Sequence, residues 1–155
     1  MCSSDLFGYD DPTASEPESI ALDALAFQNP NVTFVAAAGN GGTDAVASPG
    51  AVYNGITVGS VGGTNFTSPS DFSSRGPVDF YNPVTNATIS GARAAVDIAA
   101  PGEQQYLAAY LGRTGGLVPL TGITQAIAST NLYFVNQDGT SFASPTVAEI
   151  GRAHV

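Results

Sequence analysis

An almost continuous apolar run, residues 32–38 (VTFVAAA), limits most strongly how this chain can fold. An alternating strand suits a sheet with one solvated face, whereas an unbroken apolar strand suits a parallel sheet covered on both faces. The run ends at residues 39–42 (GNGG), where glycine allows the chain to turn through positive φ. We therefore expect a buried parallel strand within an α/β fold.

A helix is predicted directly before this strand. Residues 15–18 (SEPE) form a capping-box pattern with proline in the first turn. Apolar residues then recur from Ile20 to Phe27 with helical spacing, and Pro30 ends the helix because the residue before proline is pushed out of the α region. A helix followed by a buried strand again indicates an α/β sheet.

The rest of the chain contains weaker structural signals. Further strands are predicted over residues 55–61 and 94–99, with surface loops over 62–93. Residues 106–111 suit a helix, and residues 132–135 suit a short strand.

Composition narrows the classes of partner. The 155 residues are 43% hydrophobic, which suits one globular domain, and four basic against thirteen acidic residues give a net charge of −9. The four basic residues are all arginine, so we expect neither nucleic acid nor a membrane surface as a partner. The single cysteine, Cys2, excludes a disulfide framework and a thiolate metal site.

Both ends have an unusual sequence. Within residues 1–6 and 150–155, CSSDL and IGRAHV resemble translations of a short-read sequencing adapter. We interpret these termini as adapter-derived and expect the biological domain to cover residues 7–148. The alternative is that they are genuine, frayed termini.

Residues 139–145 (GTSFASP) are the segment richest in chemical information. Gly139 permits a sharp turn, and Pro145 is best tolerated near a helix start. Such a turn places Ser141 at a helix N-terminus, where unpaired N–H groups favour developing negative charge. Taken alone, the segment is better explained by a serine that only caps a helix.

Four segments together resemble the subtilisin-like serine proteases, the subtilases. They are residues 35–41 (VAAAGNG), 72–77 (FSSRGP), 96–102 (VDIAAPG) and 139–145 (GTSFASP), and they follow the order found in that family. The resemblance spans residues 32–148. It implies an incomplete three-layer α/β sandwich with a mostly parallel sheet and an endopeptidase acting on polypeptides through an acyl-enzyme.

The resemblance also assigns roles to individual residues. It implies that Ser141 is the nucleophile and that Asn40 donates its side-chain N–H to the oxyanion, alongside the backbone N–H of Ser141. It implies that Ala37, Ala38 and Gly39 present backbone to the substrate and line the primary specificity pocket. For Asn40, the alternative is a left-handed turn residue before glycine. From the habits of the family and the acidic, lysine-free composition we expect secretion. No cofactor is assigned, and the resemblance allows Ca²⁺ in the full-length parent.

The chain departs from the family by lacking the motifs of the catalytic Asp and His. Its single histidine, His154, follows Ser141 and is interpreted as a tail residue. Structural hydrogen bonding is expected for Asp97 and Asp138, and a loop-fixing salt bridge for Arg75. We therefore expect an internal fragment that is inactive alone and needs the missing N-terminal part of its own domain.

Two further hypotheses stay open from the sequence. The first is a pseudoprotease or binding domain that has kept the fold but lost the triad. The second is an acidic secreted β module without catalysis, which predicts that Asn40 and Ser141 lie far apart.

Overall fold

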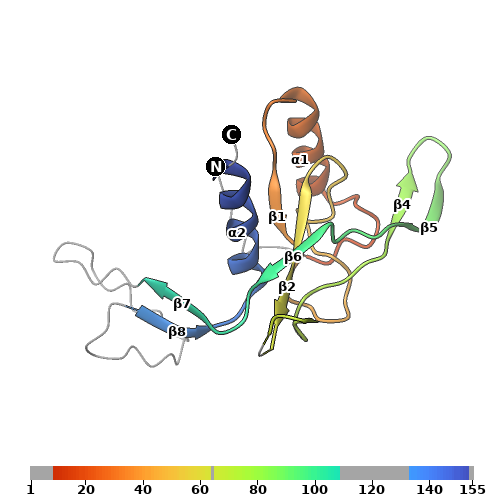
Figure 1. The fold of residues 1–155 in the computed structure, drawn as a ribbon. Coiled ribbons are helices and arrows are strands. Elements are labelled where there is room, and N and C mark those ends of the chain that lie inside the picture. Colours follow the sequence, from red (N-terminus) through yellow and green to blue (C-terminus); the bar gives the residue numbers. More distant parts are fainter. Residues whose placement is uncertain (1–8, 64, 109–132, 154–155) are drawn as a thin grey trace, which may run out of the picture.

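The structure, a computed structural model, describes residues 9–63, 65–108 and 133–153. It has an incomplete α/β fold whose elements are shown in Figure 1. In chain order they are α1 (Pro17–Gln28), β1 (Val35–Ala37), β2 (Ile56–Gly62), β3 (Ser68–Pro69), β4 (Val78–Asn82), β5 (Ala87–Arg93), β6 (Ile98–Pro101), β7 (Gln105–Ala108), β8 (Tyr133–Gln137) and α2 (Thr140–Ala153).

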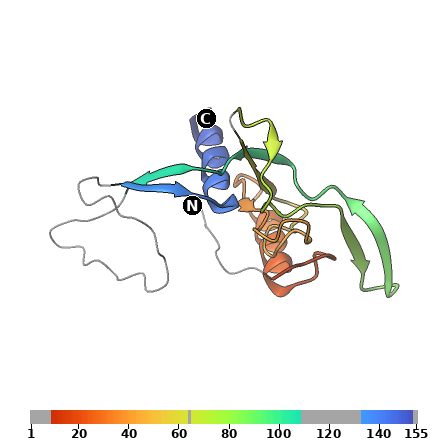
Figure 2. The same cartoon turned by 90° about the horizontal axis from the view of Figure 1, so that it is seen from below.

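The central sheet is built around β2. It pairs in parallel with β1, where Val35 lies opposite Ile56, and with β6, where Val58 lies opposite Ile98. The short strand β3 adds an antiparallel pair. Helices α2 and α1 lie on opposite sides of β1 in both views (Figures 1 and 2). The predicted parallel strand near residues 32–38 and the strand predicted at 55–61 are confirmed, although β1 is shorter than its apolar run.

The N-terminus of α1 is capped differently from the prediction. The N-cap residue is Glu16, which makes no side-chain capping bond, while Ser15 Oγ bonds Thr13 Oγ1 at 2.7 Å. The buried carboxylate of Asp11 instead accepts the backbone N–H groups of Ser15 and Glu16, at 2.8 and 3.2 Å. The capping box is therefore wrong, because an acidic side chain upstream satisfies this helix entry. The helix ends before Pro30, as predicted.

The large apolar side chains of α1 are mostly exposed. Only Ser19 and Ala26 of this helix are buried, whereas Ile20, Leu25 and Phe27 are 55%, 48% and 83% exposed. The helical spacing predicted the element correctly, but the face that it buries is the small-residue face.

Three other predictions are corrected. Residues 62–93 include the β4–β5 hairpin, which projects from the body in Figure 1, as well as loops. The strand predicted at 94–99 begins only at Ile98, because Ala95 has φ of 69° and breaks the extended backbone. Residues 105–108 form β7, which pairs with the predicted strand β8, so the helix over 106–111 is wrong as far as Ala108. Residues 109–111 lie outside the described residues.

The core consists of small side chains in two clusters. One contains Ala38, Val46, Ala51, Val78 and Ala95, and the other contains Val58, Ala100 and Ala143. Because Ala143 belongs to α2, the second cluster fixes the helix that carries Ser141 against the sheet. In the described part of the chain, neither helix is long and apolar enough to cross a membrane.

Candidate active site

The turn after β1 brings Asn40 to the carboxyl end of the strand. Gly39 has φ of 104°, and a Cβ added to it would lie 2.9 Å from the Cβ of Ala47, so glycine is required for both conformation and space. Asn40 is not among the described non-glycine residues with positive φ. The alternative that Asn40 serves as a left-handed turn residue is therefore wrong.

The side chain of Asn40 is held by the residue before Ser141. The backbone N–H and the hydroxyl of Thr140 both donate to Asn40 Oδ1, each at 2.9 Å. The Gly39 N–H in turn donates to Thr140 Oγ1 at 3.2 Å. Because these bonds use the amide oxygen, Asn40 Nδ2 remains as a donor, and it lies 3.7 Å from the position that a Cβ on Gly139 would take.

Ser141 is the second residue of α2, as the sequence predicts for a serine at a helix N-terminus. Its side chain is half-buried, and its backbone N–H has no hydrogen bond to any residue within the described ranges. An unpaired N–H at the positive end of a helix favours a negative charge. Asn40 thus contacts the residue adjacent to Ser141, so the hypothesis that places Asn40 and Ser141 far apart is wrong.

The three residues predicted to line the specificity pocket follow the same strand. The Ala38 N–H donates to Val58 O and its carbonyl accepts from Ala47, both at 2.9 Å. The Gly39 carbonyl accepts from Ser74 N at 3.0 Å. The backbone of Ala38 and Gly39 is therefore already bonded within the protein. The role of Ala37, Ala38 and Gly39 in a specificity pocket stays a prediction.

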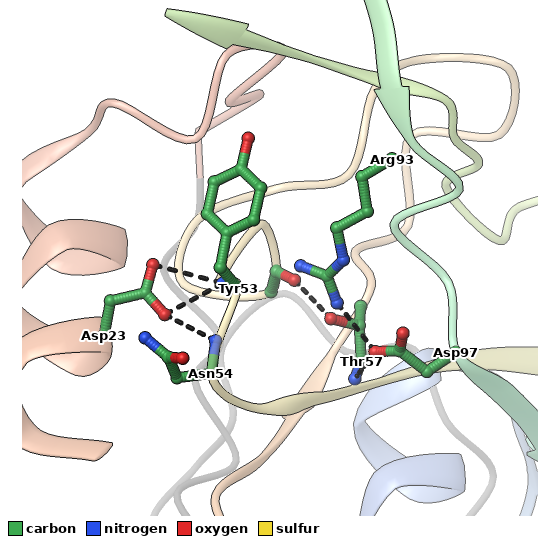
Figure 3. Close-up of polar contacts among 7 residues, drawn as sticks. Asp23, Tyr53, Asn54, Thr57, Arg93 and Asp97 are labelled. Carbon is green, nitrogen blue, oxygen red and sulfur yellow. Dashed lines mark hydrogen bonds and ion pairs between the residues drawn. The ribbon is translucent and has the colours of Figure 1, made fainter. Parts of the chain in front are cut away.

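Two acidic residues have structural partners. Asp97 Oδ2 accepts from Thr57 N and pairs with Arg93 Nη2, both at 2.8 Å (Figure 3). Asp138 Oδ1 accepts from Gln104 N at 2.8 Å. Both carboxylates therefore have the structural hydrogen bonds that the sequence led us to expect.

Two further charged residues were singled out in the sequence, Arg75 and His154. Arg75 forms no ion pair with the residues that the structure describes, and only its backbone N–H bonds Asp44 O. Its predicted salt bridge is therefore not formed within this part of the chain. His154 lies outside the described residues.

The loop before β2 is held by a protein carboxylate. Asp23 accepts the N–H groups of Tyr53 and Asn54 at 2.7–3.1 Å (Figure 3). Within the described ranges, no group of three or more His, Cys, Asp or Glu side chains is arranged to hold a metal ion. Ca²⁺ in a full-length parent stays a prediction.

Two positioning residues were not predicted from the sequence. They are Thr140, described above, and Ser74, whose buried hydroxyl accepts the Gly41 N–H at 3.0 Å. Both belong to segments that carry the family resemblance, which was the available signal.

The comparisons with known proteins agree with the resemblance carried by the four segments. The model of the subtilase family matches residues 7–151. The prenylagaramide maturation protease PagA is 23% identical with a TM-score of 0.57, and the match covers 95% of this chain and 40% of that one. A mutant of the PatA protease domain is 27% identical with a TM-score of 0.55, covering 92% and 38%. A cold-adapted subtilisin-like serine proteinase is 26% identical with a TM-score of 0.52, covering 92% and 39%.

The chain therefore spans about 40% of the length of these solved structures. No curated protein matches it.

Proposed function

Because the chain belongs to the subtilase family, we propose that it carries the nucleophile and the oxyanion hole of a serine endopeptidase. One observation supports this most directly. Thr140 holds the oxygen of the Asn40 amide through two hydrogen bonds, which leaves the nitrogen as a donor beside the N-terminus of α2. The proposed substrate class is polypeptide.

In the proposed mechanism, Ser141 Oγ attacks the scissile carbonyl carbon and the carbonyl oxygen becomes an oxyanion. Asn40 Nδ2 and the Ser141 N–H donate to that oxyanion. Donors that are fixed before the reaction need no reorganisation as charge develops, so they stabilise the transition state more than the substrate. When the oxyanion collapses, the scissile C–N bond breaks and the amine leaves with the proton that the base took from Ser141 Oγ. The acyl group stays on Ser141 as an ester until water hydrolyses it.

A general base is the missing component. Attack by a serine hydroxyl needs a base within hydrogen-bond reach and a group that orients the base. Among the described residues near Ser141, Asp138 is bonded to Gln104, and no histidine is present. We propose that the base and its carboxylate are supplied by the N-terminal part of the same domain, and that these 155 residues alone are inactive. Secretion of the parent stays a proposal based on family habit.

The open edge of the sheet supports this need for more chain. Within the described residues, β1 pairs only with β2, and the adjacent helix α1 exposes Ile20 and Phe27. An unpaired edge strand and a helix with exposed apolar side chains each suit coverage by further elements of the same domain.

The test compares variants of the parent protein that includes the upstream segment. Ser141→Ala should abolish peptide hydrolysis, and Asn40→Ala should lower kcat by about 10²–10³-fold with little change in KM. Ser144→Ala is the matched control, because it removes a buried hydroxyl from the same helix and should leave turnover unchanged.

Two results would contradict the proposal. Turnover by residues 1–155 alone that is lost on Ser141→Ala would show that no external base is needed. An inactive parent with an intact fold would instead favour a pseudoprotease or binding domain.

A further inference from the structure

The sequence contains two Asn-Gly dipeptides, Asn40-Gly41 and Asn54-Gly55. Such a pair is prone to deamidation, because glycine lets its amide nitrogen approach the asparagine side chain. The nitrogen attacks Cγ and forms a new C–N bond, the bond to the side-chain nitrogen breaks, and ammonia leaves with the proton of the glycine N–H. Water then opens the cyclic imide to aspartate or isoaspartate.

At Asn40-Gly41, both reacting groups are restrained. The Gly41 N–H donates to Ser74 Oγ at 3.0 Å, and Asn40 Oδ1 accepts two bonds from Thr140 at 2.9 Å. Ser74 and Thr140 are each 1% exposed, so water does not readily replace these bonds. Because the reaction needs close approach in one orientation, the restraints must break before the nitrogen reaches Cγ.

At Asn54-Gly55, no such restraint is found. Asn54 is exposed, and its backbone N–H bonds Asp23 Oδ1 at 2.7 Å (Figure 3). Neither its side-chain amide nor the Gly55 N–H has a hydrogen bond to another described residue. The same dipeptide is therefore free to reach the reactive geometry in this loop.

We propose that Asn54 is a site of spontaneous deamidation in this chain and that the Ser74 hydroxyl protects Asn40 from the same reaction. A related peptide bond near Ser141 is restrained in a similar way, since the Gly139 N–H of Asp138-Gly139 donates to Gly102 O at 2.8 Å. The groups that would react are hydrogen-bonded in the two pairs near Ser141, whereas the Asn54 side chain and the Gly55 N–H have no hydrogen bond to another described residue.

Protection of Asn40 has a consequence that rests on the proposed function. Deamidation would replace the Nδ2 donor by a carboxylate oxygen. A negative charge would then stand where the oxyanion forms, and the site would repel the transition state that it is proposed to stabilise.

The experiment follows deamidation of the full chain in mildly alkaline buffer, with and without concentrated urea, by peptide mapping and mass spectrometry. In urea, the two asparagines should react at similar rates. Without urea, the rate at Asn40 should be at least roughly ten times lower than the rate at Asn54, because its reaction requires local opening.

A matched pair of variants isolates the effect of the Ser74 hydroxyl on deamidation of Asn40. Ser74→Ala should raise the rate at Asn40 by roughly two- to tenfold, the effect of one lost neutral hydrogen bond, without changing the rate at Asn54. Ser73→Ala removes a neighbouring buried hydroxyl that accepts the Ser60 N–H, and it should change neither rate. If Ser74→Ala fails to fold, as shown by hydrogen exchange in β2, Thr140→Val tests the other restraint and should also accelerate Asn40.

Equal rates at the two asparagines without urea would overturn the proposal, as would an unchanged Asn40 rate in both variants. If Ser73→Ala accelerated deamidation of Asn40 as much as Ser74→Ala does, the protection would come from the fold in general. That result would contradict the role proposed for the Ser74 hydroxyl. The experiment measures a chemical change in the chain. The deamidation proposal can therefore fail or hold independently of the proposed proteolytic function.

Discussion

At the scale of single residues, Thr140 joins the turn that carries Asn40 to the helix that carries Ser141. Its hydroxyl donates to Asn40 Oδ1 and accepts from the Gly39 N–H. Thr140→Val removes both bonds and leaves a backbone donor unpaired beside a buried side chain. The free energy of unfolding, measured in urea, should fall by about 1–3 kcal/mol.

The conservative variant separates the hydroxyl from the methyl group. Thr140→Ser keeps both hydrogen bonds and should cost no more than about 0.8 kcal/mol, the value of one buried methyl-sized group. Thr146→Val, on the exposed side of the same helix, should have little effect. A serine variant as unstable as the valine variant would show that packing, not hydrogen bonding, is the main contribution of Thr140.

The sequence identified Asn40 and Ser141 as candidate residues because each lies in a recognisable motif. It did not identify how they are held, since the bonds from Thr140 to Asn40 cross 100 positions of the chain. A local pattern predicts which residues turn or cap a helix, but it carries no information on a partner that only folding brings close. The restraint by Ser74 was missed for the same reason.

At the scale of elements, Asp23 joins α1 to the loop that precedes β2. Its carboxylate accepts the N–H groups of Tyr53 and Asn54 (Figure 3). Asp23→Asn weakens charge-assisted bonds, so the free energy of unfolding should fall by about 1–3 kcal/mol. Hydrogen exchange at the two backbone amides should accelerate in parallel.

Asp71→Asn is the matched control for this element contact. Asp71 is exposed, and its carboxylate has no hydrogen bond to another described residue, so the same substitution should leave stability nearly unchanged. Equal losses in the two variants would point to overall charge rather than to the link between α1 and the loop.

Parallel strands were predictable from the sequence, but the projecting hairpin was not. The unbroken apolar run at residues 32–38 contains β1, whose three residues are buried or half-buried, and its parallel neighbour β2 is buried along most of its length. In contrast, β5 is almost entirely exposed and is held at its base by long side chains. Arg93 lies 5.6 Å from the centre of the Tyr53 ring, which packs edge-on against Phe80. Burial raises the pKa of Tyr53, an effect that Arg93 opposes.

At the scale of the whole molecule, exposed apolar surface and net charge have opposite effects on self-association. Helix α1 exposes Ile20, Ala24 and Phe27, which share one face at helical spacing. The charge of −9 keeps copies of the chain apart at low ionic strength. The same surface that suits coverage by further elements of the domain therefore favours self-association once repulsion is screened.

Sedimentation velocity of residues 1–155 should accordingly show more association as salt rises, because the screening length falls from about 10 Å at 0.1 M to about 3 Å at 1 M. Changing Ile20 and Phe27 together to glutamine should reduce that association, since it removes apolar surface without altering charge. Val84→Gln is the control, because Val84 is 89% exposed but lies at the distant hairpin turn. A chain that stays monomeric at high salt, or that responds equally to the control, would show that this face of α1 is not the cohesive surface.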